Sequence, residues 1–222
     1  MSSEVTVTVR GEHEARVAPE RATVNVSVRT DGSERTDVVE SALRFADPVR
    51  SSISDRSDAG TVVDWSSKRI SVRAERPWSS EGTRLDPVYY ASIDFTATFA
   101  EASDLSLWVS DISAWDGVEV GWVDWHLTSE TRTQVERDVA ASAVGVAVSR
   151  AEAYAGALGL DEITPLEIAD VGLISSGQPA PGAPMLKARG AVAFAADSAP
   201  AMEYEPEEIV ISATVEARFL AR

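Results

Sequence analysis

The sequence predicts an α+β protein whose sheets are largely antiparallel. Apolar residues alternate with polar ones in several runs, which is the period of a half-buried strand. Three other segments place apolar residues three and four positions apart, as one face of a helix requires. The strands come in pairs rather than in strict alternation with helices, so the expected order is ββαββαβαββ. Short linkers predict a single domain over residues 1–222, with two lobes that share one core as the alternative.

The first thirty residues contain two alternating runs, Val5–Val9 and Ala22–Val28. The link between them, Gly11–Glu20, begins with glycine and has a proline near its end, and both residues commonly interrupt regular structure. We therefore expect two strands joined by a polar elbow as a hairpin.

A helix is expected next, over Ser33–Ile53, because its apolar residues share one helical face. Pro48 lies inside that pattern and lacks an amide hydrogen, which predicts a kink or an early end near Ala46 or Asp47. A strand over residues 62–74 and a cleaner one over residues 89–99 should then form a hairpin. The polar loop Pro77–Pro87 between them carries Trp78.

A short helix follows, with Ser103 as its expected cap and Ala102, Leu105, Trp108, Val109 and Ile112 on its buried side. In the strand that starts after Gly117, the apolar face changes sides between Trp122 and Val123. One extra residue in a ladder has this effect, so we predict a β-bulge there. A strand buried on both faces is the alternative.

The longest helix is expected over Thr131–Leu158, with Gly159 in place for a left-handed cap. Its apolar side is expected to include Val135, Val139, Ala143, Val146, Ala147, Ala153, Tyr154, Ala157 and Leu158. Its many alanines favour helix and allow another backbone to approach closely. Arg150 falls in the seam and should reach an edge or pair with an acid.

The rest of the chain is expected to form strands over residues 162–174 and 191–195, separated by a surface loop over residues 175–188. Six alternating apolar positions from Ile209 to Phe219 predict a long final strand. The acids before it, Glu203, Glu205, Glu207 and Glu208, read as a charged approach to this strand rather than as a cation site.

Three of these segments resemble the SIMPL domain family, formerly a domain of unknown function, which includes periplasmic immunogenic and oxidative-stress-defence proteins of bacteria. The first is the opening, with Gly11, then Val17, Ala18, Pro19 and Glu20 before the second strand. The second is the end of the long helix, Ser149–Leu160, and the third is the final strand after Tyr204, Glu205 and Pro206. The resemblance implies homo-oligomers and a stress or envelope association, and it brings no catalytic motif. His13, where relatives often have glycine, and Pro48 depart from the pattern.

Composition excludes several classes of function. The formal net charge is −16, and the only lysines are Lys68 and Lys187, which argues against partners such as nucleic acid or an anionic membrane surface. Cysteine is absent, so disulfides and cysteine-ligated metals are excluded. No apolar run is long enough for membrane insertion. As written, the chain is expected to be cytoplasmic; removal of a leader would make it secreted or periplasmic.

The sequence contains no recognisable catalytic, cofactor-binding or metal-binding motif. No catalytic, cofactor-binding or metal residue is therefore predicted, and no cofactor is expected. His13 lies between Glu12 and Glu14, yet an extended backbone turns it to the side opposite both acids. His126 reads as a polar-face residue of its strand. Neither a nucleophile elbow nor a phosphate loop occurs.

The six tryptophans are concentrated in the middle of the chain, at Trp65, Trp78, Trp108, Trp115, Trp122 and Trp125. Core packing accounts for Trp108 and for one of Trp122 and Trp125. Exposed aromatic residues are enriched at interface centres, so Trp78, Trp122 and Trp125 are the candidate interface residues, with a ligand pocket as the alternative.

These observations favour a non-enzymatic, self-assembling or protein-interaction module. Its subunit contacts are expected at the tryptophan-bearing middle strands and the alanine-rich helix. The alternatives are a small-molecule binding protein or acid-dependent hydrolase with a carboxylate-lined pocket, and an adaptor for a specific protein partner.

Overall fold

The computed structural model describes residues 4–174 and 206–222, and these form two compact units. In the described residues, unit 1 comprises 4–18, 127–174 and 208–222, and unit 2 comprises 19–126 and 206–207. Both units pair antiparallel strands with helices, so the predicted α+β class is confirmed. The described part also contains one strand more than expected between the first two helices.

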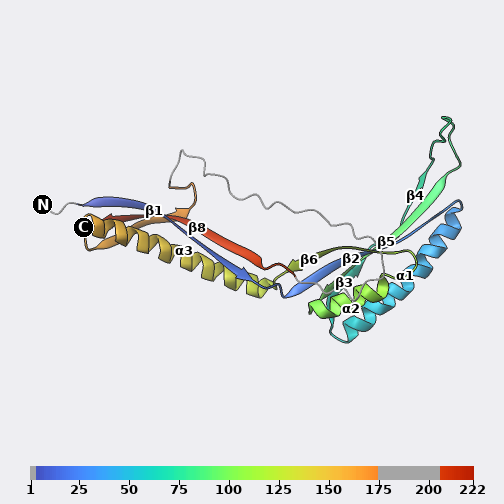
Figure 1. Ribbon diagram of the computed structural model, residues 1–222, viewed down its shortest axis with the longest axis horizontal. Helices are drawn as coiled ribbons and strands as arrows, with labels where there is room; N and C mark the ends of the chain where they lie inside the picture. Colours follow the sequence, from blue (N-terminus) through green and yellow to red (C-terminus); the bar gives the residue numbers. More distant parts are fainter. Residues whose placement is uncertain (1–3, 175–205) are drawn as a thin grey trace. The chain divides into compact units, whose positions relative to one another are not determined.

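Unit 1 is a three-stranded sheet with one long helix on one face. The strands are β1 (Val5–Val17), β8 (Ile209–Ala221) and β7 (Ile163–Asp170), in the order β1-β8-β7. Figure 1 shows helix α3 (Ser129–Ala157) lying along β1 and β8. The core between these layers consists mainly of valines and alanines, with Phe219 its largest side chain.

The opening strands do not form the expected hairpin. β1 pairs with β8, whereas β2 (Arg21–Gly32) belongs to unit 2, and the expected elbow is extended strand as far as Val17. Gly11 is not a turn residue, because it lies inside β1. A Cβ built on it would lie 2.0 Å from the carbonyl oxygen of Ala143 in α3. Its role is to let β1 approach α3, which confirms that the alanines of this helix admit a second backbone.

Helix α3 ends as predicted. Gly159 has a φ of +75°, the left-handed conformation expected for a residue just beyond a helix. The amide of Leu160 donates to the carbonyl of Ala155 at 3.0 Å, and that of Gly159 donates to Gly156 at 3.0 Å. Arg150 reaches the sheet edge, where Nη1 donates to the carbonyl of Arg10 at 2.8 Å.

Unit 2 is a five-stranded sheet covered on one face by two helices. The strand order is β3-β5-β2-β6, with β4 also pairing with β5. The strands besides β2 are β3 (Val62–Ser67), β4 (Ser71–Glu75), β5 (Val88–Phe99) and β6 (Val118–His126). Helices α1 (Arg35–Asp58) and α2 (Ala102–Ile112) pack on the same sheet face around buried Trp108, Phe95 and Phe99.

Three local expectations in unit 2 are wrong. The early end expected for helix α1 is wrong, because the helix continues through exposed Pro48 with Ala46 and Val49 both buried against the sheet, and the kink stays a prediction. The strand expected over residues 62–74 is two strands, since the chain leaves the ladder after Ser67 and rejoins β5 at Ser71. The N-cap residue of α2 is Glu101 rather than Ser103, and its side chain makes no capping hydrogen bond.

The predicted β-bulge in β6 is confirmed. Val24 pairs with Val123 and Val26 pairs with Val120, so two residues of β6, Gly121 and Trp122, lie opposite Asn25. The extra residue lets Val120 and Val123 both pack against the core although they differ in parity.

Candidate functional site

The tryptophans divide into core and surface residues. Trp108 is fully buried, and its indole nitrogen donates to the hydroxyl of Ser52 at 3.0 Å. Trp125 is half-buried and packs against the same core, whereas Trp122 is 66% exposed. The expectation that the core takes only one of these two neighbours is therefore confirmed, because the bulge turns Trp122 out of it.

The three candidate interface residues do not form one patch. Trp122 lies on β6, at one edge of the sheet. Trp78 lies in the loop after β4, on the other side of β5, and is 63% exposed with the Arg84 guanidinium 4.9 Å from its ring centre. Trp78 and Trp122 stay predicted interface residues, at two different places on the surface of unit 2. Trp125 lines a pocket.

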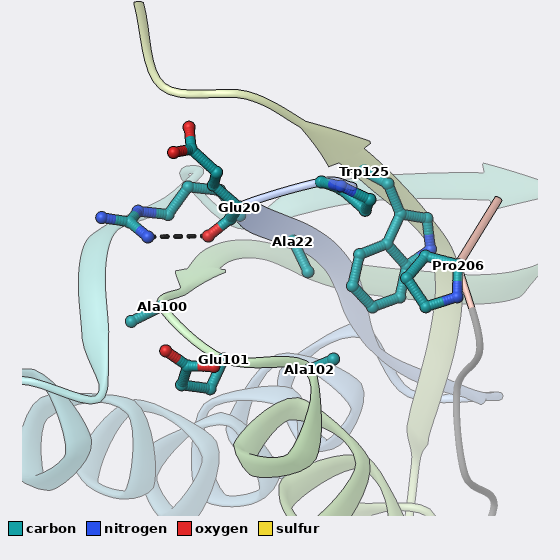
Figure 2. A pocket seen from close by; sticks show the side chains of 9 residues that line it. Glu20, Ala22, Ala100, Glu101, Ala102, Trp125 and Pro206 are labelled. Carbon is teal, nitrogen blue, oxygen red and sulfur yellow. Dashed lines mark hydrogen bonds between the residues drawn. The ribbon is translucent and has the colours of Figure 1, made fainter. Parts of the chain in front are cut away.

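The pocket beside Trp125 lies within unit 2 and has a volume of about 350 Å³. Figure 2 shows the Trp125 indole and Pro206 on one side of it and the start of α2 below. Two carboxylates line it, Glu20 and Glu101, but Figure 2 shows the Glu20 side chain directed away from Glu101. A carboxylate-pair mechanism needs two acids that face each other across the substrate, and these two do not.

The histidines lie on separate elements. The extended backbone of β1 puts His13 on the face opposite Glu12 and Glu14, and His13 lines a surface groove beside α3. No group of three or more metal-ligating side chains occurs within residues 4–174 and 206–222. Nε2 of His126 is 2.9 Å from the hydroxyl of Thr23, on the helix-free face of the unit 2 sheet.

The residues of helix α3 form two ridges of small side chains, each with a spacing of four. One ridge is buried against β1 and β8 and consists of Ala143, Ala147, Ala151 and Ala155. The other, which we call the outer ridge, is exposed and consists of Gly145, Ser149, Ala153 and Ala157. Each residue of the outer ridge follows a residue of the buried ridge by two positions, as Gly145 follows Ala143, and two positions correspond to about 200° around the helix. The outer ridge therefore points away from the sheet of unit 1.

This placement corrects the predicted buried side of the helix. Ala153 and Ala157 are exposed, as are Tyr154 at 56% and Leu158 at 61%. Val146 is half-buried and lines a groove of about 570 Å³ together with His13, Ser149 and Ala153. The four-residue spacing, present twice in the sequence, is the signal that identifies both ridges.

The outer ridge lies in a segment almost free of charge. Between Asp138 and Asp161 the only charged residues are Arg150 and Glu152, although the chain as a whole carries −16. In the described part of the chain, no helix is both long and apolar enough to span a membrane. A helix surface of small side chains with few charges around it is suited to close contact with another helix.

One carboxylate of unit 1 has a perturbed pKa. Glu162 and Arg222 lie side by side at the end of the sheet and exchange backbone hydrogen bonds of 3.0 Å in both directions. Two side-chain hydrogen bonds of 3.0 Å from Arg222, together with its charge, lower the pKa of Glu162. The pKa of Arg222 is raised by the same contacts. This pair joins β7 to the end of β8 and faces no pocket.

Several predicted features lie outside the described residues: the loop 175–188, the strand 191–195 and the acids Glu203 and Glu205. Glu207 and Glu208 directly precede β8 and are exposed, as a charged approach to the strand would be.

The chain matches the model of a protein family. The model of a family described as SIMPL, protein of unknown function (DUF541), matches residues 7–219. This match confirms the resemblance that the opening strand, the end of α3 and the final strand indicated. None of the curated proteins matches the chain.

Proposed function

The chain belongs to the SIMPL family of proteins of unknown function, and we propose that it works as a non-enzymatic interaction module that self-assembles by pairing α3 with α3 of a second copy. The observation that carries this proposal is the exposed outer ridge, which repeats on the solvent side of α3 the small-residue pattern that the sheet covers on the other side.

The buried ridge supports the proposal by showing what such a pattern does in this protein. At Gly11 the backbone of β1 approaches so closely that a Cβ would lie 2.7 Å from the amide nitrogen of Ala147. The outer ridge, from Gly145 to Ala157, offers the same freedom from side-chain bulk. Two helices whose residues four apart form ridges pack with those ridges interdigitated, at an angle of roughly 50°.

The low local charge of this surface supports a second copy of the chain as its partner. Two copies that each carry −16 repel one another, so they associate most readily where the local charge is lowest. The segment between Asp138 and Asp161 meets that condition, because its two charges cancel. The same surface on both copies gives a two-fold interface, the commonest symmetry of soluble homo-oligomers.

The test is the mass of the protein in solution, measured by size exclusion with light scattering. We expect a mass of at least twice the 23.7 kDa of one chain. Ser149→Glu places a charge on the outer ridge of each copy and should return the protein to a monomer. Ser51→Glu is the matched control, since Ser51 is an exposed serine of α1 in the other unit, and its variant should keep the native mass.

Two outcomes would overturn the proposal. A monomeric native protein at tens of micromolar favours the adaptor alternative, in which a different protein binds. A native assembly that Ser149→Glu leaves intact assigns self-association to another surface, with Trp122 and Trp78 as the next candidates.

A further inference from the structure

The helix-free face of the unit 2 sheet contains a trough of about 610 Å³. Residues from four adjacent strands line it: Arg29, Thr30 and Asp31 from β2, Ser71 and Arg73 from β4, Tyr90, Ala91 and Ser92 from β5, and Glu119 from β6. All of these residues belong to unit 2, whereas α3 belongs to unit 1.

Strand register arranges the side chains of the trough in two rows. Ser92 pairs with Arg29 on one side and Ser71 on the other, and Tyr90 pairs with Asp31 and Arg73. Strand spacing and the step between alternate residues give this grid backbone dimensions of about 10 by 7 Å. The short serines form the floor, and the longer side chains form the walls.

The four charged residues that line the trough, Arg29, Arg73, Asp31 and Glu119, carry no net charge together. A nitrogen of Arg29 lies 2.6 Å from a carboxylate oxygen of Glu119, and Arg73 lies 3.4 Å from Glu75 with its guanidinium 5.0 Å from the ring centre of Tyr90. An anionic ligand would meet guanidinium groups already paired with acids, in a chain of strongly negative charge. A cationic ligand would meet the same two arginines. The lining therefore favours a ligand without net charge.

Hydrogen-bonding groups remain for such a ligand. Among the residues that the structure describes, the hydroxyls of Ser71, Ser92 and Tyr90 have no hydrogen-bond partner, and neither does the carboxylate of Asp31. The set contains hydroxyls, which donate and accept, and a carboxylate, which accepts. A ligand that matches it must carry several hydroxyl groups of its own.

The floor of the trough is held in place from behind. Ala91 lies between Tyr90 and Ser92 in β5, is buried, and packs with Val38 and Ala42 of α1 on the other face of the sheet. The hydroxyl of Thr30 donates to the carbonyl of Val38 at 2.9 Å. A site fixed before binding loses less entropy when it is occupied.

From this geometry we propose that the trough binds a neutral saccharide of one to three rings. Its ring hydroxyls bond to Ser71, Ser92 and Asp31, and the two paired arginines donate to further ring oxygens. This inference is independent of self-assembly through α3, because every residue that carries it belongs to unit 2.

The test is saturation-transfer NMR on the full chain with a panel of neutral probes: glucose, galactose, mannose, N-acetylglucosamine, maltotriose and chitotriose. Galacturonate, glucose 6-phosphate and glucosamine are the charged comparisons. At least one neutral probe should bind, and more tightly than its charged counterpart. Arg73→Ala should weaken that binding about tenfold, the usual effect of losing a hydrogen bond to a charged group. Ser92→Phe, which fills the floor, should abolish it.

Arg76→Ala is the matched control, because Arg76 is exposed three residues along the chain from Arg73 and does not line the trough. This variant should bind like the native protein. Amide spectra of both trough variants establish that the fold is kept. The proposal is overturned if no neutral probe binds, if the charged probes bind as well or better, or if binding survives in Ser92→Phe.

Discussion

The two units of this chain solve the same packing problem with side chains of different size. Unit 2 fills the space between its sheet and two helices with Trp108, Phe95 and Phe99. Unit 1 uses alanines on α3 and a glycine on the facing strand β1, so that backbone approaches backbone. Large side chains stabilise unit 2 through the volume they fill. The packing of unit 1 requires small side chains, or none, at the few positions where β1 contacts α3.

The difference extends to the surface that each unit leaves open. In unit 2 the helices cover one face of the sheet, and the other face is polar, with cross-strand hydrogen bonds such as that of Thr23 with Thr98 at 2.8 Å. In unit 1 the outer ridge of α3 consists of small, uncharged residues, Gly145, Ser149, Ala153 and Ala157. A polar sheet face suits a hydroxylated ligand, and a bare helix face suits another helix.

The largest effect is expected when volume is removed from unit 2. Trp108→Ala should lower the free energy of unfolding by about 3–5 kcal/mol, since it leaves a cavity and also removes the hydrogen bond to Ser52. Amide hydrogen exchange should accelerate in α2 and β5 and stay unchanged in β1 and β8. Trp108→Phe, which keeps most of the volume, should cost less. Equal acceleration in both units would refute separate cores.

A smaller loss is expected when volume is added to unit 1. Gly11→Ala should cost about 1–3 kcal/mol, because its Cβ would overlap the carbonyl of Ala143 and push β1 from α3. Hydrogen exchange should now accelerate in β1 and α3 alone. Gly145→Ala is the control on the other side of the same helix, where a Cβ meets nothing within 4 Å. It should raise stability by about 0.5–1 kcal/mol through helix propensity.

The smallest effect concerns the Glu162 and Arg222 pair of unit 1. Because the folded pKa of Glu162 lies below its usual value of 4.5, the pair adds stability above that value and loses it as the pH falls through the lowered pKa. The contribution is small, since both side chains are exposed. Carboxyl NMR should follow this titration, and Arg222→Gln should return the pKa of Glu162 toward 4.5. An unchanged titration would mean that the pair does not form in solution.

Sequence patterns predicted the fold where local rules decide. The bulge beside Trp122 followed from a change of parity, and the left-handed Gly159 followed from its position after an alanine-rich helix. Sequence patterns gave wrong predictions where contacts between residues distant in the sequence determine the structure. Gly11 resembles a turn residue until α3 is placed against it, and Pro48 resembles a helix end until the buried residues on both sides of it are known.

The candidate surfaces show the same limit. The sequence contains both small-residue ridges of α3, but only the sheet determines that the ridge of Ala147 is covered and that of Ser149 is exposed. The trough could not be predicted, because Arg29, Arg73 and Tyr90 come from three strands that only the register brings together.

Self-pairing of α3 is tested most directly by a cross-link within the outer ridge. The chain contains no cysteine, so Ser149→Cys introduces a single thiol, and Ser51→Cys provides the matched control on α1. With a short bismaleimide reagent at micromolar protein, Ser149→Cys should give a covalent dimer and Ser51→Cys should stay monomeric. A monomer from Ser149→Cys, or equal dimer from both variants, would contradict pairing through α3.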